Sequence, residues 1–191
     1  MAKIEGIIPH IIKWETGVIG HAGEEPAVLF ERARKKGFAN DPLDNGGATQ
    51  TGVTLATYKE YCKRNNISEP TVENLKNIPY NVWREILKTM YWDRWKADQI
   101  NSQAVANMLV DWVWASGKHG IRKPQELLGV KVDGIVGNKT LAAVNGRGEI
   151  GLFYQLRDAR IAHFENIVKA NPSQKKWLNG WKNRVMDLKF V

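Results

Sequence analysis

The sequence has only one cysteine, Cys62, which excludes an internal disulfide bond. Its neighbours Tyr58 and Tyr61 lie at helical spacing, so a buried structural thiol is expected. The four histidines are scattered and show no metal-ligand spacing. Neither a metal nor another cofactor is therefore expected.

Long apolar runs are also lacking. No stretch approaches the roughly 20 residues that a membrane-spanning helix needs. The first six residues lack the apolar core and small-residue cleavage site of a signal peptide. We expect no membrane span and synthesis in the cytoplasm without a secretion signal.

Acidic residues are outnumbered, with 20 Asp and Glu against 28 Lys and Arg, and the formal net charge is +8. Residues 169–191 carry six basic side chains but only one acidic one, Asp187. Such a patch attracts polyanions in general, whether nucleic acid, anionic membrane or a cell-wall polymer. Because the sequence contains no nucleic-acid recognition motif, nucleic acid is not the expected partner.

Helical patterns run through most of the 191 residues, without a repeat or a flexible linker. We predict a mainly α fold of two closely packed lobes, with a small turn or extended segment near residues 40–54. The predicted domains are 1–105 and 106–191. Thr54, Thr71, Ser102 and Ser173 are expected to cap helices. Residues 26–37 are expected to form a short, exposed helix.

Glu15 closes an apolar helical stripe formed by Ile4, Ile8, Ile11 and Ile12, and at 100° per residue it returns to the same face. Apolar surroundings and the negative end of the helix dipole both disfavour a charged carboxylate. A carboxyl group that resists ionising is suited to act as a general acid. The alternative is that Glu15 is simply the last, solvated residue of a short helix.

Residues 40–49, Asn-Asp-Pro-Leu-Asp-Asn-Gly-Gly-Ala-Thr, form a turn-rich segment. Glycoside hydrolysis needs a second polar group beside the acid, which stabilises the transition state or positions water. The segment offers Asp44 as the first choice and Asp41, Thr49 and the nearby Thr54 as alternatives. Small residues, Gly46 and Gly47, allow the backbone to approach a sugar closely, although an ordinary turn has the same composition.

Aromatic rings present flat apolar faces to sugars, and the candidates for lining a groove are Tyr91, Trp92, Trp95, Trp112 and Trp114. Core packing is the favoured interpretation for Trp92 and Trp95. Packing is likewise favoured over anchoring on an anionic wall for Trp177 and Trp181. Further along, Asp133 is expected to satisfy backbone donors in a structural loop.

Taken together, these residues resemble the lysozymes of glycoside hydrolase family 108, followed by a predicted peptidoglycan-binding domain. The family motifs are Glu-Gly-Gly-Tyr, then Asn-Asp-Pro-x-Asp-x-Gly-Gly-x-Thr and Gly-x-Thr. This chain has Glu-Thr-Gly-Val at 15–18, the full turn at 40–49 and Gly-Val-Thr at 52–54. Tyr91-Trp92, the segment 111–117 and Asp133-Gly-x-x-Gly-x-x-Thr140 also resemble the two domains.

The resemblance implies N-acetylmuramidase activity on peptidoglycan glycan strands, with Glu15 as the essential acid. Asp44 and Thr49 complete the expected catalytic group. The expected substrate-binding residues are Asp41, Gly46, Gly47, Thr54, Tyr91, Trp92, Asp111 and Trp114. The protein is expected to act as a monomer on the cell wall or in the periplasm, after release by another route.

The sequence departs from the family in two places. Thr16 replaces a glycine, and about twenty residues, 18–37, are inserted before the turn resumes. The insertion supplies Glu24, Glu25 and Glu31 as alternative acids. Glu15 is preferred because Glu31, flanked by Arg32 and Arg34, lacks the apolar stripe that precedes Glu15. A second hypothesis is a non-catalytic peptidoglycan-binding or wall-remodelling protein that retains the lysozyme fold.

Overall fold

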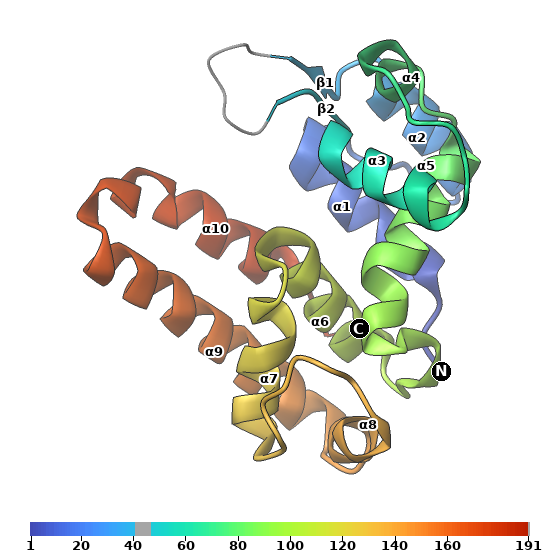
Figure 1. Ribbon diagram of the computed structural model, residues 1–191. Coiled ribbons are helices and arrows are strands. Elements are labelled where there is room, and N and C mark those ends of the chain that lie inside the picture. Colours follow the sequence, from blue (N-terminus) through green and yellow to red (C-terminus); the bar gives the residue numbers. More distant parts are fainter. Residues whose placement is uncertain (41–46, 191) are drawn as a thin grey trace. The chain divides into compact units, whose positions relative to one another are not determined.

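The computed structural model describes residues 1–40 and 47–190, and the chain divides into two compact units. Ile8–Met90 form one, here called the sheet unit. Met1–Ile7 and Tyr91–Val191 form the other, called the helix unit. Most elements are helices, which confirms the predicted mainly α class (Figure 1). No helix in the described ranges is long and apolar enough to cross a bilayer.

The sheet unit contains, in chain order, α1 (Ile8–Thr16), α2 (Pro26–Arg34), β1 (Phe38–Ala39), β2 (Thr49–Gln50), β3 (Val53–Thr54), α3 (Leu55–Arg64), α4 (Val72–Lys76) and α5 (Tyr80–Leu87). A π-helical turn, Lys88–Trp92, follows α5. The helix unit contains α6 (Gln103–Ser116), α7 (His119–Leu128), α8 (Asn138–Asn145), α9 (Glu149–Ala170) and α10 (Lys175–Asp187), with 3-10 turns at Ile4–Gly6, Asp93–Trp95, Ala97–Gln99 and Pro172–Gln174.

Side-chain caps define several helix starts. Thr54, Thr71 and Ser102 each accept a hydrogen bond from the backbone N–H three residues later, which confirms the predicted caps. The cap predicted at Ser173 is wrong, because α10 begins at Lys175. Asn171 instead accepts a hydrogen bond from the N–H of Ser173 and caps the preceding 3-10 turn.

The first helix begins later than its apolar pattern suggests. Ile4–Gly6 form a separate 3-10 turn, and α1 starts at Ile8. Pro9 therefore lies in the first helical turn, where its missing N–H leaves no hydrogen bond unmade. The stripe of α1 is fully buried at Ile8, Ile11 and Ile12.

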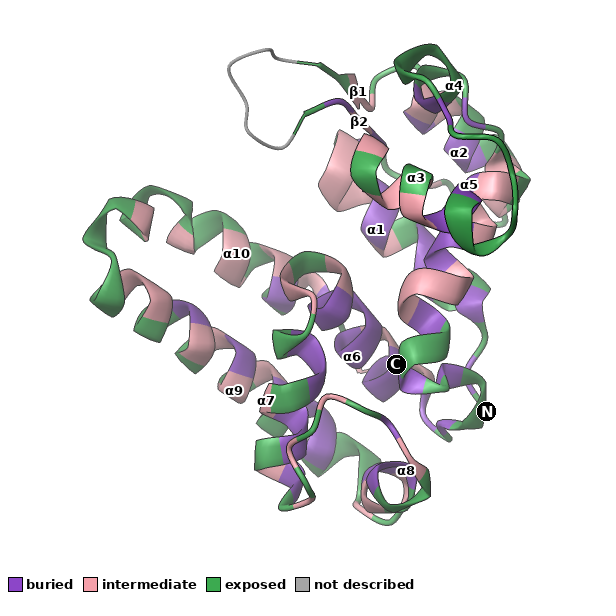
Figure 2. Ribbon diagram, in the orientation of Figure 1, coloured by how far each residue is buried: buried purple, intermediate pink, exposed green. Residues whose placement is uncertain are grey.

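The inserted segment supplies core rather than an exposed helix. Leu29, Phe30 and Ala33 of α2 are all buried. Figure 2 shows part of the α2 ribbon in the colour of buried residues. The Phe30 ring lies 5.1 Å from that of Trp83 and 5.7 Å from that of Tyr80, both on α5. The prediction of an exposed helix at 26–37 is therefore wrong. The basic residues of this segment suggested an exposed helix, but they flank its apolar face and do not occupy it.

The sheet has the order β1-β2-β3, and both pairs are antiparallel. Thr51 and Gly52 join β2 to β3 with φ values of 46° and 77°, as a two-residue type I′ hairpin requires. A threonine pays a conformational cost at positive φ. Three hydrogen bonds hold Thr51 there. Its N–H donates to the Gly37 carbonyl at 3.0 Å, its carbonyl accepts from Trp83 Nε1 at 3.0 Å, and its hydroxyl donates to Gln50 at 3.1 Å.

In the helix unit, α6 packs against both α7 and α9, and α9 packs against α10 (Figure 1). Trp95 and Trp112 are fully buried, in agreement with the packing interpretation of Trp95. Trp181 packs on Phe164 with ring centroids 5.4 Å apart, whereas Trp177 is 53% exposed. The packing prediction therefore holds for Trp181 and is wrong for Trp177.

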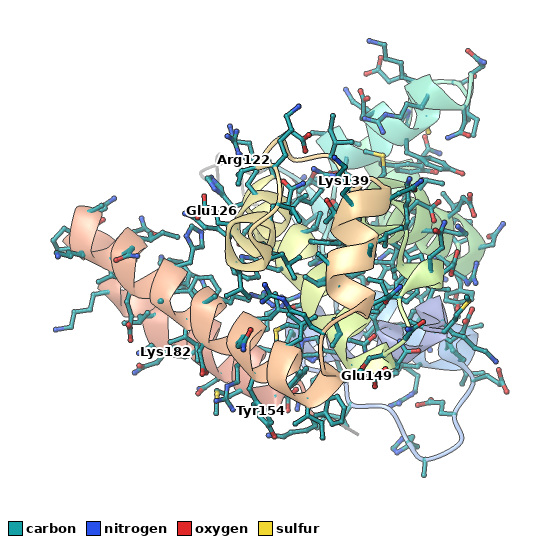
Figure 3. All side chains as sticks on the ribbon, turned by 90° about the horizontal axis from the view of Figure 1, so that it is seen from below. Arg122, Glu126, Lys139, Glu149, Tyr154 and Lys182 are labelled. Atoms are coloured by element: carbon teal, nitrogen blue, oxygen red, sulfur yellow. The ribbon has the colours of Figure 1, made fainter. Side chains whose placement is uncertain are left out.

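Charged side chains cover the outside of the helix unit. Arg122, Glu126 and Lys139 extend from α7 and α8 into solvent (Figure 3). Between α7 and α8, Asp133 accepts a hydrogen bond from the N–H of Ile135 at 2.9 Å, which confirms its predicted structural role. Cys62 of the sheet unit is buried, also as predicted, and burial raises the pKa of its thiol.

The first seven residues belong to the helix unit. The N–H of Ala2 donates to the carbonyl of Ile100 at 2.8 Å. Lys3 and Gln103 exchange two hydrogen bonds, at 2.8 and 3.0 Å, between the Lys3 backbone and the Gln103 amide. Ile4 and Ile7 are buried. The helix unit is thus assembled from two stretches of chain.

His163 makes the stability of the helix unit dependent on pH. Burial is the main cause that lowers its pKa below the ordinary 6.5, and neighbouring His119, Lys123 and Arg160 lower it further, while Glu126 acts in the opposite direction. The folded state therefore binds fewer protons at this site than the unfolded state as the pH falls through 6.5. We expect the melting temperature to fall between pH 7.5 and pH 5, partly through His163.

The measurement is the melting temperature across that range for the wild type and His163→Gln. The variant should show a shallower decline. His21→Gln, at an exposed position in the sheet unit, is the control and should retain the wild-type slope. An unchanged slope in His163→Gln would contradict the prediction.

Candidate active site

Glu15 is the penultimate residue of α1 and is half-buried. The helix ends directly after it because Gly17 adopts a φ of 71°, and its N–H donates to the carbonyl of Lys13 at 2.8 Å. Thr16, at the family's glycine position, donates its hydroxyl to the carbonyl of Ile12 at 2.8 Å and accepts from the N–H of Val18 at 3.2 Å. Glu15 thus lies at the margin of the buried stripe rather than within it.

Gly37 joins the end of α1 to the small sheet. A methyl group at Gly37 would lie 2.9 Å from Cγ2 of Thr16. The same methyl group would lie 2.6 Å from Oγ1 of Thr51 and 2.9 Å from Oε1 of Gln50. The last turn of α1, which carries Glu15, therefore adjoins the sheet that carries Thr49 and Thr54.

Gly37→Ala should destabilise the protein by about 1–3 kcal/mol, because the added methyl group must displace atoms of three neighbours. Urea unfolding measures the change. Gly180→Ala is the control, since its helical position has open space around the added group, and a gain of about 0.5–1 kcal/mol is expected there. Equal stability of Gly37→Ala and the wild type would show that the contact relaxes freely.

Thr49 and Thr54 are direct partners across the β2–β3 pair, and Ala39 pairs with Thr49 across β1–β2. Opposed residues of antiparallel strands share a face, so both threonines lie on one face of the sheet. The Thr54 hydroxyl contacts both the N–H and the hydroxyl of Thr57, at 3.1 and 3.0 Å. Thr54 therefore caps α3, while Thr49 is half-buried without a capping role.

The central part of the predicted turn lies outside the described residues. Asp41, Asp44 and Gly46 all fall there. Gly47, the first described residue after it, is exposed and has a φ of 66°. Of the predicted catalytic residues, Glu15 and Thr49 are described, and the last turn of α1 places Glu15 near the sheet that carries Thr49. The expected role of Asp44 stays a prediction.

The inserted glutamates differ from Glu15 in their surroundings. Glu24 accepts two hydrogen bonds from Arg32, at 2.8 and 2.7 Å, and one from the N–H of His21 at 3.0 Å. The hydrogen bonds from Arg32 are the main cause that lowers the pKa of Glu24, which favours the ionised form over a proton donor. Glu31 is exposed and pairs with Arg34 at 2.6 Å.

Two of the predicted aromatic residues meet in the helix unit. The rings of Tyr91 and Trp114 lie 4.6 Å apart, and both residues are half-buried. Trp92 is fully buried, and its Nε1 donates to Asp98 at 2.8 Å. Its side chain is therefore part of the core, and the substrate contact predicted for it has no exposed surface to form on.

Asp111 also departs from its predicted role. Its side chain is fully buried and pairs with Arg160 at 2.8 Å and with Arg184 at 2.8 Å. A carboxylate enclosed in this way is a structural charge partner rather than a group that contacts substrate. Sequence reasoning missed Arg160, although it occupies a position of the apolar stripe formed by Leu156 and Phe164, four residues to either side.

Two family profiles match successive parts of the chain, in the order that the sequence motifs indicated. The Glycosyl hydrolase 108 profile matches residues 32–117, and the Predicted Peptidoglycan domain profile matches residues 119–186. The first match begins within α2, so α1 and Glu15 precede it. Residues 32–117 are thus similar to glycosyl hydrolase 108 domains and residues 119–186 to predicted peptidoglycan domains, and the two matches together indicate a function related to peptidoglycan.

Among solved structures, SagA of Brucella abortus is similar to this chain. The two share 27% sequence identity with a TM-score of 0.66, over 84% of this chain and 91% of SagA. No curated protein matches the chain. The likeness agrees with the mainly α, lysozyme-like fold predicted from the sequence.

Proposed function

We propose that this protein is an N-acetylmuramidase that cleaves the bond between N-acetylmuramic acid and N-acetylglucosamine. Glu15 donates a proton to the glycosidic oxygen, while a water held by Asp44 or Thr49 attacks the anomeric carbon. The protein acts on the cell wall as a monomer. The glycosyl hydrolase 108 match and the adjoining peptidoglycan domain support this substrate class.

The observation that carries the proposal is the junction between α1 and the sheet. Thr16, the neighbour of Glu15, packs beside Gly37, and Gly37 in turn accepts a hydrogen bond from the N–H of Thr51 between β2 and β3. A half-buried carboxyl group is thereby held beside a sheet whose face carries Thr49. Glycoside hydrolysis needs a general acid and a second polar group that stabilises the transition state or positions water, and Glu15 and Thr49 are candidates for these two roles.

Analysis of the digestion products tests the reaction. Purified peptidoglycan is incubated with the protein, reduced with borohydride and separated into muropeptides. We expect products whose reduced end is N-acetylmuramic acid. A reduced N-acetylglucosamine end would instead identify a different glycosidase.

A second candidate is a non-catalytic peptidoglycan-binding protein. Two observations favour it: Thr16 stands at the family's glycine position, and Glu15 lies outside the matched range 32–117. Sedimentation with purified sacculi separates the two functions. Binding without release of new reducing ends would support the second candidate.

A further inference from the structure

The ends of α2 and α4 meet β1 and β2 in the sheet unit (Figure 1) and enclose a pocket of about 250 Å³. We call it the back pocket, and it is lined by six residues of these elements and their ends: Arg34, Lys35, Phe38, Gln50, Lys76 and Asn77. Half of the six are basic, and no carboxylate is among the described residues that line the pocket.

The back pocket lies on the face of the sheet opposite Thr49. Phe38 and Gln50 are direct partners across β1–β2, and the next pair along the strands is Ala39 with Thr49. Successive residues of a strand point to opposite faces of a sheet. A ligand in the back pocket is therefore a different group from the sugar that would meet Thr49.

Gln50 gives the back pocket a fixed floor. It is 1% exposed, and its Nε2 donates to the carbonyl of Lys76 at 2.8 Å. Its Oε1 accepts a hydrogen bond from the hydroxyl of Thr51 at 3.1 Å. The first of these hydrogen bonds ties the end of α4 to β2, so a buried contact sets the spacing of the lining elements.

Two of the three positive charges in the lining are not balanced. Arg34 is balanced, because its Nε and Nη2 donate to Glu31 at 3.2 and 2.6 Å. The Nζ of Lys76 lies 5.9 Å from the centre of the Phe38 ring. Neither Lys35 nor Lys76 has a carboxylate within ion-pair distance in the described part of the chain. The lining therefore contributes two uncompensated ammonium groups.

Helix dipoles explain only part of this arrangement. Lys35 directly follows α2 and Lys76 is the last residue of α4, and the negative end of a helix dipole favours basic residues there. This preference accounts for each lysine separately, but not for the convergence of both helix ends on one pocket. An anionic group supplied by a ligand would stabilise both ammonium groups at once.

The remaining lining residues favour a peptide carboxylate over other anions. Nδ2 of Asn77 donates to the carbonyl and to the carboxylate of Glu73, which leaves Oδ1 able to accept a hydrogen bond. A peptide carries an amide N–H beside its carboxylate, whereas a phosphodiester has no such donor. Ligand sites commonly measure about 300–1,000 Å³, so this smaller pocket suits one amino-acid residue rather than a glycan chain.

We propose that the back pocket binds a carboxylate-bearing residue of a peptidoglycan stem peptide. The carboxylate pairs with Lys35 and Lys76, and the adjoining amide donates to Asn77. An extended peptide of about five residues reaches about 17 Å, which is enough to pass the edge strand β1 while its glycan lies on the opposite face of the sheet. This inference rests on the peptidoglycan-related part of the proposed function, and it is independent of catalysis by Glu15.

NMR of the backbone amides in the full-length protein tests the site. The probe is N-acetyl-L-alanyl-D-glutamate, and its diamide is the uncharged control. We expect the probe to shift the signals of Phe38, Gln50 and Asn77 saturably, with a Kd at least about fivefold lower than that of the diamide. Inorganic phosphate forms a third arm. Equal binding of probe and diamide, or a Kd for phosphate equal to that of the probe, would overturn the proposal.

Variants of the two lysines locate the binding event. Lys35→Gln combined with Lys76→Gln should raise the Kd of the probe at least about fivefold. Lys63→Gln combined with Lys139→Gln removes the same charge from two exposed positions outside the pocket and should change the Kd by less than about twofold. All four positions are exposed, and circular dichroism checks that both variants fold. Equal Kd values for the two variants would show that net charge alone attracts the probe.

Sedimentation with sacculi tests the same site on the polymer. Sacculi freed of phosphate-bearing polymers are compared before and after their carboxylates are converted to methylamides. We expect the wild type and Lys63→Gln/Lys139→Gln to prefer the unmodified sacculi, and Lys35→Gln/Lys76→Gln to lose most of this preference. A preference that persists in Lys35→Gln/Lys76→Gln would assign it to other basic surfaces and overturn the proposal.

Release of reducing ends, measured on the same proteins, separates the two proposals. If the wild type binds the probe with the expected preference but releases no reducing ends, the muramidase proposal fails and the back-pocket proposal stands. If it releases reducing ends but binds probe and diamide equally, the reverse holds.

Discussion

Glu15→Gln should lower the rate at which the protein releases reducing ends from purified peptidoglycan by about 10²–10⁴-fold. Glutamine retains the size and polarity of glutamate but has no carboxyl proton to donate. Because Glu15 lies at the margin of the core, we expect the melting temperature to change little. Initial rates from a reducing-sugar assay, together with thermal unfolding, measure both quantities.

Two other glutamates provide matched controls. Glu31→Gln removes an exposed carboxylate on α2 and should leave the rate unchanged. Glu24→Gln removes the group that pairs with Arg32, and its effect should appear mainly in stability. Full activity of Glu15→Gln, with loss of activity in Glu24→Gln, would move the general acid to the inserted segment.

Asp111→Asn should destabilise the helix unit by about 3–5 kcal/mol. The substitution keeps the shape of the side chain but leaves two guanidinium groups without their carboxylate partner. Arg160 is fully buried and the Arg184 side chain is only 14% exposed, so water cannot fully replace that partner. Urea unfolding monitored by tryptophan fluorescence measures the loss.

Asp158→Asn is the control on α9. Its carboxylate is 65% exposed and pairs with Arg157, so its removal should cost less than about 1 kcal/mol. A combined replacement, Asp111→Leu with Arg160→Met and Arg184→Met, should recover much of the stability lost in Asp111→Asn. A loss of under 1 kcal/mol in Asp111→Asn would mean that the buried cluster tolerates unpaired charge.

Local sequence signals predicted the parts of the fold that local chemistry determines. Thr54, Thr71 and Ser102 each accept the hydrogen bond that a cap requires, and Pro9 lies in the first turn of a helix. Asp133 satisfies a backbone donor two residues away. Such interactions involve neighbours in the sequence, and the residue types alone are therefore sufficient to indicate them.

Contacts between distant segments were less accessible to sequence reasoning. Asp111 and Arg184 are 73 positions apart, so a buried ion pair between them has no local signature. The apolar face of α2 is hidden among basic residues, and its partner Trp83 lies on another helix. At the candidate site, the motifs indicated Glu15 and Thr49, whereas the role of Gly37 depends on three segments that meet only in the folded chain.

The helix unit is built from two separate stretches of chain, and this determines the order in which its parts can pair during synthesis. The sheet unit spans Ile8–Met90 without interruption, so all of it has left the ribosome while more than half of the chain is still to come. Ala2 and Lys3 must wait for Ile100 and Gln103 before their hydrogen bonds can form. The part that carries Glu15 can thus mature early, while the leading segment stays unpaired until its later partners emerge.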